Sequence, residues 1–196
     1  MAIVMQAMTT DLSMPEGFDY MAELRYGGNG DLWAAPEYDA GRTTGDVESG
    51  RTTWDENILD GIDSGLQEVE LYMDASGIRW TVGGQQIMYS PGTFNSIDQI
   101  KIIAGVDMQA LFSWSDVEVK FYDDGNQIDS WADLDGPTVD QTGDPYASQL
   151  GEIFTITPEG TADAVRILAS VRLGCPEGVY LGENSVFGQI LISTQA

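Results

Sequence analysis

Residues 110–136 read ALFSWSDVEVKFYDDGNQIDSWADLDG, and this stretch carries the clearest structural pattern in the chain. Leu111, Val117, Val119 and Phe121 have one parity, and Asp116, Glu118 and Lys120 have the other. Because successive side chains of a strand point to opposite faces, this alternation predicts a strand with one buried and one solvated face. We expect Val117, Val119 and Phe121 in the core.

Two acidic loops follow this strand. Asp123, Asp124, Gly125 and Asn126 are residue types that tight hairpin turns favour, and DLDG at 133–136 forms a second acidic segment. Residues 122–151 are acidic and irregular as a whole, so we expect loops there, with a helical turn within PYASQL at 145–150.

Short alternating or apolar runs, separated by turn residues, occur along most of the chain. They predict strands at 18–26, 67–74, 77–82, 85–89, 97–106, 151–157, 164–173 and 186–193. TWDE at 53–56 has the pattern of a capping box, which predicts a short helix over 54–60. The helices that a parallel α/β fold needs between its strands are missing from this pattern. The sequence therefore predicts an all-β protein, a single antiparallel β-sandwich of the jelly-roll or Greek-key type with one or two short helices and long acidic loops.

The chain is expected to form one domain over residues 1–196. Its apolar start predicts a first strand of the domain's own sheet. Alternatively, residues 1–12 form an N-terminal arm that adds to the sheet edge of a neighbouring copy. Residues 27–53 lack periodicity and predict a long irregular surface loop. The related sequences GRTTGD at 41–46 and GRTTWD at 50–55 are too few for a repeat architecture.

The charge is strongly negative, with 32 acidic against 8 basic residues and a net charge of −24. Such a surface repels phosphate groups, so neither nucleic acid nor anionic lipid is an expected partner. It suits divalent cations, a basic partner or a saline environment. No apolar run approaches the roughly 20 residues of a membrane span. The first residues, MAIVMQAMTTDL, lack the basic start and long apolar stretch of a signal peptide.

The residue inventory excludes several chemistries. Histidine is absent, which excludes Ser-His-Asp and Cys-His catalysis and any histidine-bound metal. Cys175 is the only cysteine, so the chain holds no internal disulfide or cysteine-bound cluster, and we expect this thiol to act as a small buried hydrophobe. Phosphate-binding glycine motifs are also missing. No catalytic residue is assigned.

The acidic loops contain the residue types that bind calcium, a hard cation that takes oxygen ligands. The candidate ligands are Asp123, Asp124, Asn126, Asp129, Asp133 and Asp135. Their spacing does not match the twelve-residue EF-hand loop. An alternative is that these residues serve the hairpin turns themselves, since Asp and Asn adopt turn conformations readily.

Exposed aromatic residues suggest carbohydrate recognition, because sugar rings stack on flat side chains. Trp114 shares the parity of Asp116 and Glu118, which predicts that it lies on the solvated face beside Tyr122 as a stacking platform. A tryptophan at such a position also suits a subunit contact.

Paired carboxylates are the catalytic groups of glycosidases. Glu68, Glu70, Asp116 and Glu118 are the candidates for such a pair, although outward carboxylates are also the ordinary solvated face of an acidic sheet.

These patterns favour a non-enzymatic structural β-sandwich protein that assembles with copies of itself, of the type found in virions, extracellular filaments or surface layers. The first alternative is a calcium-assisted carbohydrate-binding module, and the next is a carboxylate-pair glycosidase. For the favoured class we expect an extracellular or virion-associated location.

Overall fold

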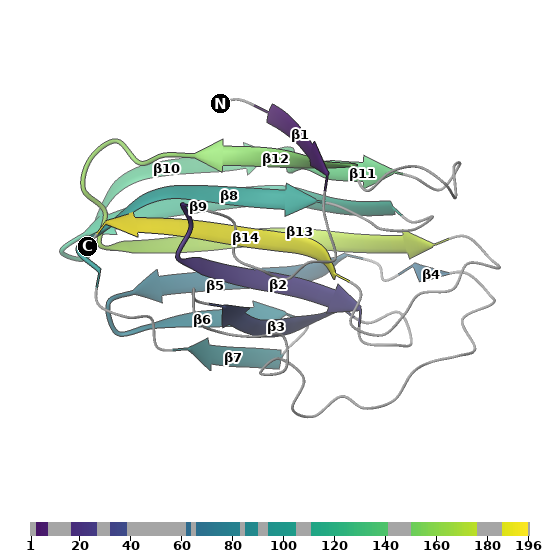
Figure 1. The fold of residues 1–196 in the computed structure, drawn as a ribbon, viewed down its shortest axis with the longest axis horizontal. Helices are drawn as coiled ribbons and strands as arrows, with labels where there is room; N and C mark the ends of the chain where they lie inside the picture. Colours follow the sequence, from purple (N-terminus) through teal and green to yellow (C-terminus); the bar gives the residue numbers. More distant parts are fainter. Residues whose placement is uncertain are drawn as a thin grey trace.

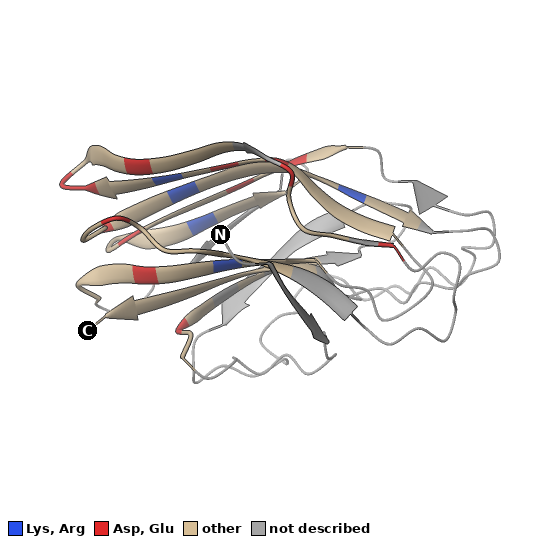
Figure 2. Ribbon diagram, turned by 90° about the horizontal axis from the view of Figure 1, so that it is seen from above, with Lys and Arg blue, Asp and Glu red and all other residues tan. Residues whose placement is uncertain are grey.

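The computed structural model describes residues 3–7, 17–26, 32–38, 62–63, 66–82, 85–89, 94–104, 111–140, 150–175 and 186–195. These ranges contain strands and no helix. The strands form two antiparallel sheets, which Figure 1 shows in face view and Figure 2 shows from the side as two layers. The prediction of an all-β protein with antiparallel sheets is therefore confirmed.

The first sheet has six strands in the order β1-β12-β8-β14-β2-β3. Their bounds are β1 Ile3–Ala7, β12 Leu150–Ile156, β8 Ser96–Ala104, β14 Val186–Gln195, β2 Tyr20–Tyr26 and β3 Leu32–Tyr38. The nearly continuous apolar sequence of β14 predicts a central strand, and β14 does lie inside the sheet, with Ile190, Leu191 and Ile192 all buried.

The second sheet has eight strands, six of them in the order β10-β9-β13-β5-β6-β7. Their bounds are β10 Asn126–Leu134, β9 Leu111–Asp123, β13 Ala164–Cys175, β5 Gln67–Asp74, β6 Gly77–Val82 and β7 Gln85–Tyr89. Two short strands complete the second sheet. Strand β11 (Thr138–Asp140) pairs with β9, and β4 (Ile62–Asp63) pairs with β13.

The chain crosses between the two sheets repeatedly after β7. Strand β8 belongs to the first sheet, β9 to β11 belong to the second, and then β12, β13 and β14 alternate between them. As a result, β13 lies between β9 and β5, while β14 lies between β8 and β2. The last two strands of the sequence therefore occupy interior positions and join segments that are far apart in the chain.

A cluster of buried hydrophobic side chains from both sheets forms the core. From the first sheet it includes Leu24, Ile100, Ile102 and Ile190, and from the second Leu71, Trp80, Val119 and Ile167. Val117, Val119 and Phe121 are fully buried, which confirms the predicted core face of this strand.

A bulge in β9 reverses the alternation that the sequence suggested for its first half. Between Glu118 and Ser115, β9 advances three residues while its partner β13 advances two, from Leu168 to Ser170. Asp116 supplies the irregular conformation, with a φ of 52°. Because the extra residue shifts the parity of the strand, Phe112 and Trp114 are buried on the same side as Val117, and Leu111 is half-exposed.

Two loop predictions need correction. Residues 27–53 were expected to be irregular throughout, but β3 occupies 32–38, where it pairs with β2. Likewise, 122–151 contains β10 and β11, both of which pair with β9 and were not expected as strands. Their alternation is weak because polar and acidic residues fill most positions of these edge strands. The predictions for 54–60, 145–149 and the GRTT segments lie outside the described residues.

Candidate functional site

The outer face of the second sheet carries a transverse row of cations and one aromatic ring. The strand register places Arg166 of β13 opposite both Lys120 of β9 and Tyr72 of β5, and Tyr72 opposite Arg79 of β6. Three of the eight basic residues of this acidic chain therefore lie in a single row.

The neighbouring row on this face supplies carboxylates. Arg166 donates from Nε to Glu70 Oε1 at 2.7 Å, and Lys120 Nζ forms an ion pair of 2.7 Å with Glu118 Oε1. The hydrogen bond to Glu70 raises the pKa of Arg166 further. Exposed ion pairs of this kind contribute about 0–1 kcal/mol each. These ion pairs therefore fix the positions of the charged side chains on this face more than they stabilise the fold.

Two hollows open on this face and share Tyr72. The smaller, of about 300 Å³, is lined by Glu70, Tyr72, Arg79, Thr81 and Arg166. The larger, of about 630 Å³, is lined by Tyr72, Asp74, Ala75, Ser76, Tyr122, Gly125, Asp163 and Ala164. We call the larger one the tyrosine hollow. It lies where the β5–β6 turn, the β9–β10 turn and the start of β13 meet.

Asp74 shapes one wall of the tyrosine hollow by holding the β5–β6 turn. Its Oδ1 accepts hydrogen bonds from Ser76 N at 2.8 Å, Ser76 Oγ at 2.5 Å and Gly77 N at 3.2 Å. Burial alone would raise the pKa of Asp74, but the hydrogen bonds from Ser76 and Gly77 outweigh it, and the pKa lies below its ordinary value.

Tyr72 is half-buried beside this carboxylate. Burial raises the pKa of its phenol, and the negative charge and hydrogen bond of Asp74 raise it further. Tyr72 therefore stays neutral at physiological pH. The guanidinium of Arg79 lies 4.9 Å from the centroid of its ring, so this ring already contacts one cation.

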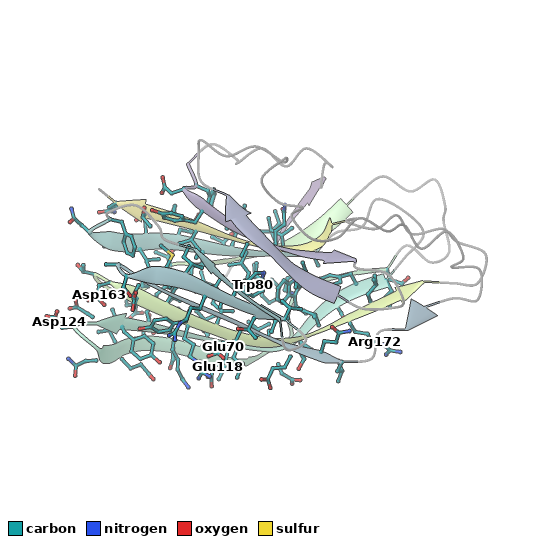
Figure 3. All side chains as sticks on the ribbon, turned by 90° about the horizontal axis from the view of Figure 1, so that it is seen from below. Glu70, Trp80, Glu118, Asp124, Asp163 and Arg172 are labelled. Atoms are coloured by element: carbon teal, nitrogen blue, oxygen red, sulfur yellow. The ribbon has the colours of Figure 1, made fainter. Side chains whose placement is uncertain are left out.

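Three carboxylates gather at the rim of the tyrosine hollow. Oxygen atoms of Asp123, Asp124 and Asp163 all lie within 4.8 Å of one another. Asp163 Oδ2 accepts a hydrogen bond from Asp124 N at 3.1 Å, and Asp163 N donates to Tyr122 O at 2.9 Å. Figure 3 shows Asp124 and Asp163 at the same end of the molecule. Such a set has the oxygen ligands that a hard cation prefers.

The other predicted calcium ligands do not join this cluster. Asn126 Nδ2 donates to Asp124 O at 3.3 Å, and the two carboxylate oxygens of Asp129 accept from Ser130 N and Glu159 N. Asp135 is exposed on the β10–β11 connection, and the side chain of Asp133 lies outside the described residues. Asp163 was missed because it lies 39 residues from Asp124 in the sequence, and only the pairing of β13 with β9 brings it there.

The predicted stacking pair of Trp114 and Tyr122 is wrong. Trp114 is only 1% exposed, and its Nε1 donates to Ile103 O of the first sheet at 2.9 Å. The β9 bulge turns it inward, which the alternation of the sequence did not reveal. Tyr122 does lie on the outer face, but its aromatic neighbour across the hollow is Tyr72.

The four candidate glycosidase carboxylates are spread over the outer face. Glu118 and Glu70 lie on either side of Leu168, two inter-strand steps or roughly 9.5 Å apart along the sheet. Each is already in an ion pair. Figure 3 shows both at the outer side of the sheet, whereas Trp80 lies between the layers. Glu68 lies opposite Ser170, and Asp116 occupies the bulge.

No protein-family model matches this chain, and a search of curated proteins finds no match either. Within the described ranges, no helix has the length and apolar character needed to cross a membrane. Function is therefore inferred from the geometry of the described residues.

Proposed function

We propose that this chain is a non-enzymatic structural protein with a jelly-roll fold that assembles with copies of itself. The strand orders support the fold. In the order β2-β14-β8-β12 facing β5-β13-β9-β10, the chain alternates between two four-stranded sheets as a jelly roll does. The remaining long strands extend these sheets at their edges, with β1 and β3 on the first and β6 and β7 on the second.

The observation that carries the assembly proposal is the position of β1. Residues Ile3–Ala7 pair with Leu150–Phe154 at one edge of the first sheet. The next strand in the sequence, β2, lies four places away, or about 19 Å across the sheet. The twelve residues 8–19 that join them span up to roughly 40 Å when extended. The same backbone pairing is therefore within reach of β12 in a neighbouring copy.

Strand addition of this kind uses backbone hydrogen bonds, which are the same within one chain and between two chains. An uncovered β12 edge is also a template for a further strand. Exchange of β1 between copies would thus join subunits without any new side-chain contact.

Deleting residues 1–12 tests the proposal. We expect light scattering to show that the full chain forms assemblies whose size increases with protein concentration. The truncated chain should form smaller particles at the same concentration. A matched control replaces residues 1–12 with a Gly/Ser segment of equal length, which keeps the chain length but lowers strand propensity. Adding a synthetic peptide of residues 1–12 to the truncated protein should give saturable binding. A full chain that stays monomeric at high concentration would contradict the proposal.

The second candidate is a calcium-assisted carbohydrate-binding module. It is favoured by one observation, the gathering of Asp123, Asp124 and Asp163 beside Tyr122. Calcium bound to the folded state alone must raise the melting temperature. The increase should disappear in Asp163→Asn and persist in Asp135→Asn, and calcium should strengthen binding of simple methyl glycosides. An unchanged melting temperature at millimolar calcium would exclude a site of useful affinity.

A further inference from the structure

The tyrosine hollow has two aromatic walls separated by a small floor residue. Tyr122 of β9 lies opposite Ala164 of β13, whereas Tyr72 of β5 lies opposite Arg166, two residues further along β13. The two tyrosines are therefore two inter-strand steps and two residues apart, or roughly 11–12 Å between their Cα atoms. Ala164 is buried between β9 and β5 and projects only a methyl group. The hollow above it has a volume of about 630 Å³, which is room for a small organic group.

The charge that lines this hollow is negative. Asp74 and Asp163 are the ionisable acids in its wall, and no lysine or arginine lines it. Asp123 and Asp124 add two more carboxylates beside Asp163. The basic row of the sheet contributes instead to the adjoining smaller hollow, through Arg79 and Arg166.

Aromatic rings and carboxylates together select a particular chemistry. Ring faces attract an organic cation through their negative charge density, and carboxylates attract it through its net charge. A neutral sugar can stack on the rings and donate hydroxyl hydrogen bonds to the carboxylates, but it has no positive charge to balance theirs. A sodium ion keeps its water shell and gains little from the rings. The Arg79 guanidinium on Tyr72 shows that one of these rings already accepts such a contact.

We propose that the tyrosine hollow is a binding site for an organic ammonium cation, held between the rings of Tyr72 and Tyr122 with Asp163 and Asp74 as its counter-charges. The ligand class is a quaternary or methylated ammonium group. The proposal does not depend on self-assembly, and it differs from the neutral sugar of the second candidate function.

Choline chloride is the probe for this site. The full chain is titrated with choline while the aromatic resonances of Tyr72 and Tyr122 are followed by NMR, at constant chloride with sodium as the replacing cation. The ring signals are assigned from Tyr72→Phe and Tyr122→Phe. We expect both rings to shift in a saturable way, with a dissociation constant on the order of 1–10 mM. The neutral isostere 3,3-dimethylbutan-1-ol has the same shape without the charge, and it should bind at least about 10-fold more weakly.

Two pairs of variants separate a binding role from a structural one. Tyr122→Phe keeps the ring and should keep choline binding, whereas Tyr122→Leu should weaken it about 10-fold or more. Asp163→Asn should weaken binding several-fold, while Asp135→Asn, an exposed carboxylate outside the hollow, should leave it unchanged. Circular dichroism and melting of each variant establish that it is folded. If Tyr122→Leu fails to fold, the comparison of choline with its neutral isostere on the native chain still decides.

The proposal is overturned by any of three results on the folded protein. The first is the absence of a saturable shift at either tyrosine, and the second is equal binding of choline and its neutral isostere. The third is a saturable shift with methyl glucoside but not with choline, which would assign the hollow to a neutral sugar.

Discussion

At the scale of single residues, Trp114 connects the two sheets. Its ring is buried beside Phe112 at a centroid distance of 5.9 Å, and its indole N–H donates to Ile103 O in the opposite sheet. A buried donor that crosses the core in this way fixes the position of a ring as well as filling space. Gly136 permits the chain to pass close by, because a Cβ there would lie 2.5 Å from Trp114 Cβ.

Replacing this ring tests its role. Trp114→Phe removes the crossing hydrogen bond and part of the packed volume, so we expect a loss of about 2–3 kcal/mol in the free energy of unfolding. Urea denaturation followed by circular dichroism measures it. Trp131→Phe is the matched control, because Trp131 is only half-buried, with its ring centroid 5.7 Å from that of Phe121. This substitution should lower the free energy of unfolding by less than about 1 kcal/mol. Equal losses in the two variants would contradict a special role for Trp114.

Asp116 is a second residue with a structural role, and this role depends on its backbone conformation more than on its carboxylate. Its φ of 52° lies in the left-handed region, which costs most side chains about 1–2 kcal/mol and is least unfavourable for Gly, Asn and Asp. We therefore expect Asp116→Val to lower the unfolding free energy by about that amount, and Asp116→Gly to leave it unchanged or slightly higher. Glu118→Val, at an ordinary strand position of the same face, should change it by less than about 0.5 kcal/mol. An unchanged free energy of unfolding in Asp116→Val would contradict the left-handed conformation of residue 116 and the bulge that contains it.

At the scale of elements, the turns that carry the tyrosine hollow depend on carboxylates. The β5–β6 turn is closed by Asp74, and the loop before β13 is fastened to the β9–β10 turn through Asp163. Asp129 similarly holds Glu159 N at 3.0 Å. Among the residues that the sequence suggested as calcium ligands, Asp129 thus accepts hydrogen bonds from the backbone N–H groups of Ser130 and Glu159, which is the turn role given as the alternative.

The lowered pKa of Asp74 gives this turn a pH dependence. Because the folded pKa lies below the unfolded value of about 3.9, the carboxylate stabilises the fold above that pH, and the contribution is lost as pH falls through the folded pKa. We expect Asp74→Asn to lower the unfolding free energy at pH 7, with the difference from the native chain shrinking below about pH 4.

Urea titrations at several pH values between neutral and strongly acidic conditions measure this difference. Asp135→Asn serves as the control, since Asp135 is an exposed carboxylate outside this turn. A difference between Asp74→Asn and the native chain that does not depend on pH would show that the amide perturbs the turn by its shape and not by its charge.

At the scale of the whole molecule, the net charge of −24 opposes compaction. Added salt screens this repulsion over distances beyond about 10 Å at 0.1 M. Raising sodium chloride from about 10 mM to about 0.5 M should therefore raise the melting temperature by several degrees, with the same effect from potassium chloride. A melting temperature that does not change with salt concentration would mean that repulsion between the acidic groups does not destabilise the fold. A larger increase with calcium chloride at equal ionic strength would instead report specific ion binding.

The sequence predicted most strands because a strand's signal is local. The β5–β6 hairpin and β13 follow from period-two alternation, and β12 and β14 follow from short apolar runs bounded by turn residues. Prediction failed at β3, whose sequence LWAAPEY lacks period-two alternation, and at β10 and β11, where polar residues fill most positions. It also failed at Trp114, where one extra residue reversed the parity that the later part of the same strand obeys.

Of the candidate site, the sequence alone identified Tyr122 and the Asp123–Asp124 turn. It also determined the all-β class, the two-faced character of β9 and the acidic surface, since these depend on residue type and near spacing. Only the tertiary structure decided that β13 lies between β9 and β5. This brings Asp163 to that turn and Tyr72 into the same hollow as Tyr122. Strand neighbours are chosen by packing between segments that lie up to a hundred residues apart or more, and no local pattern encodes that choice.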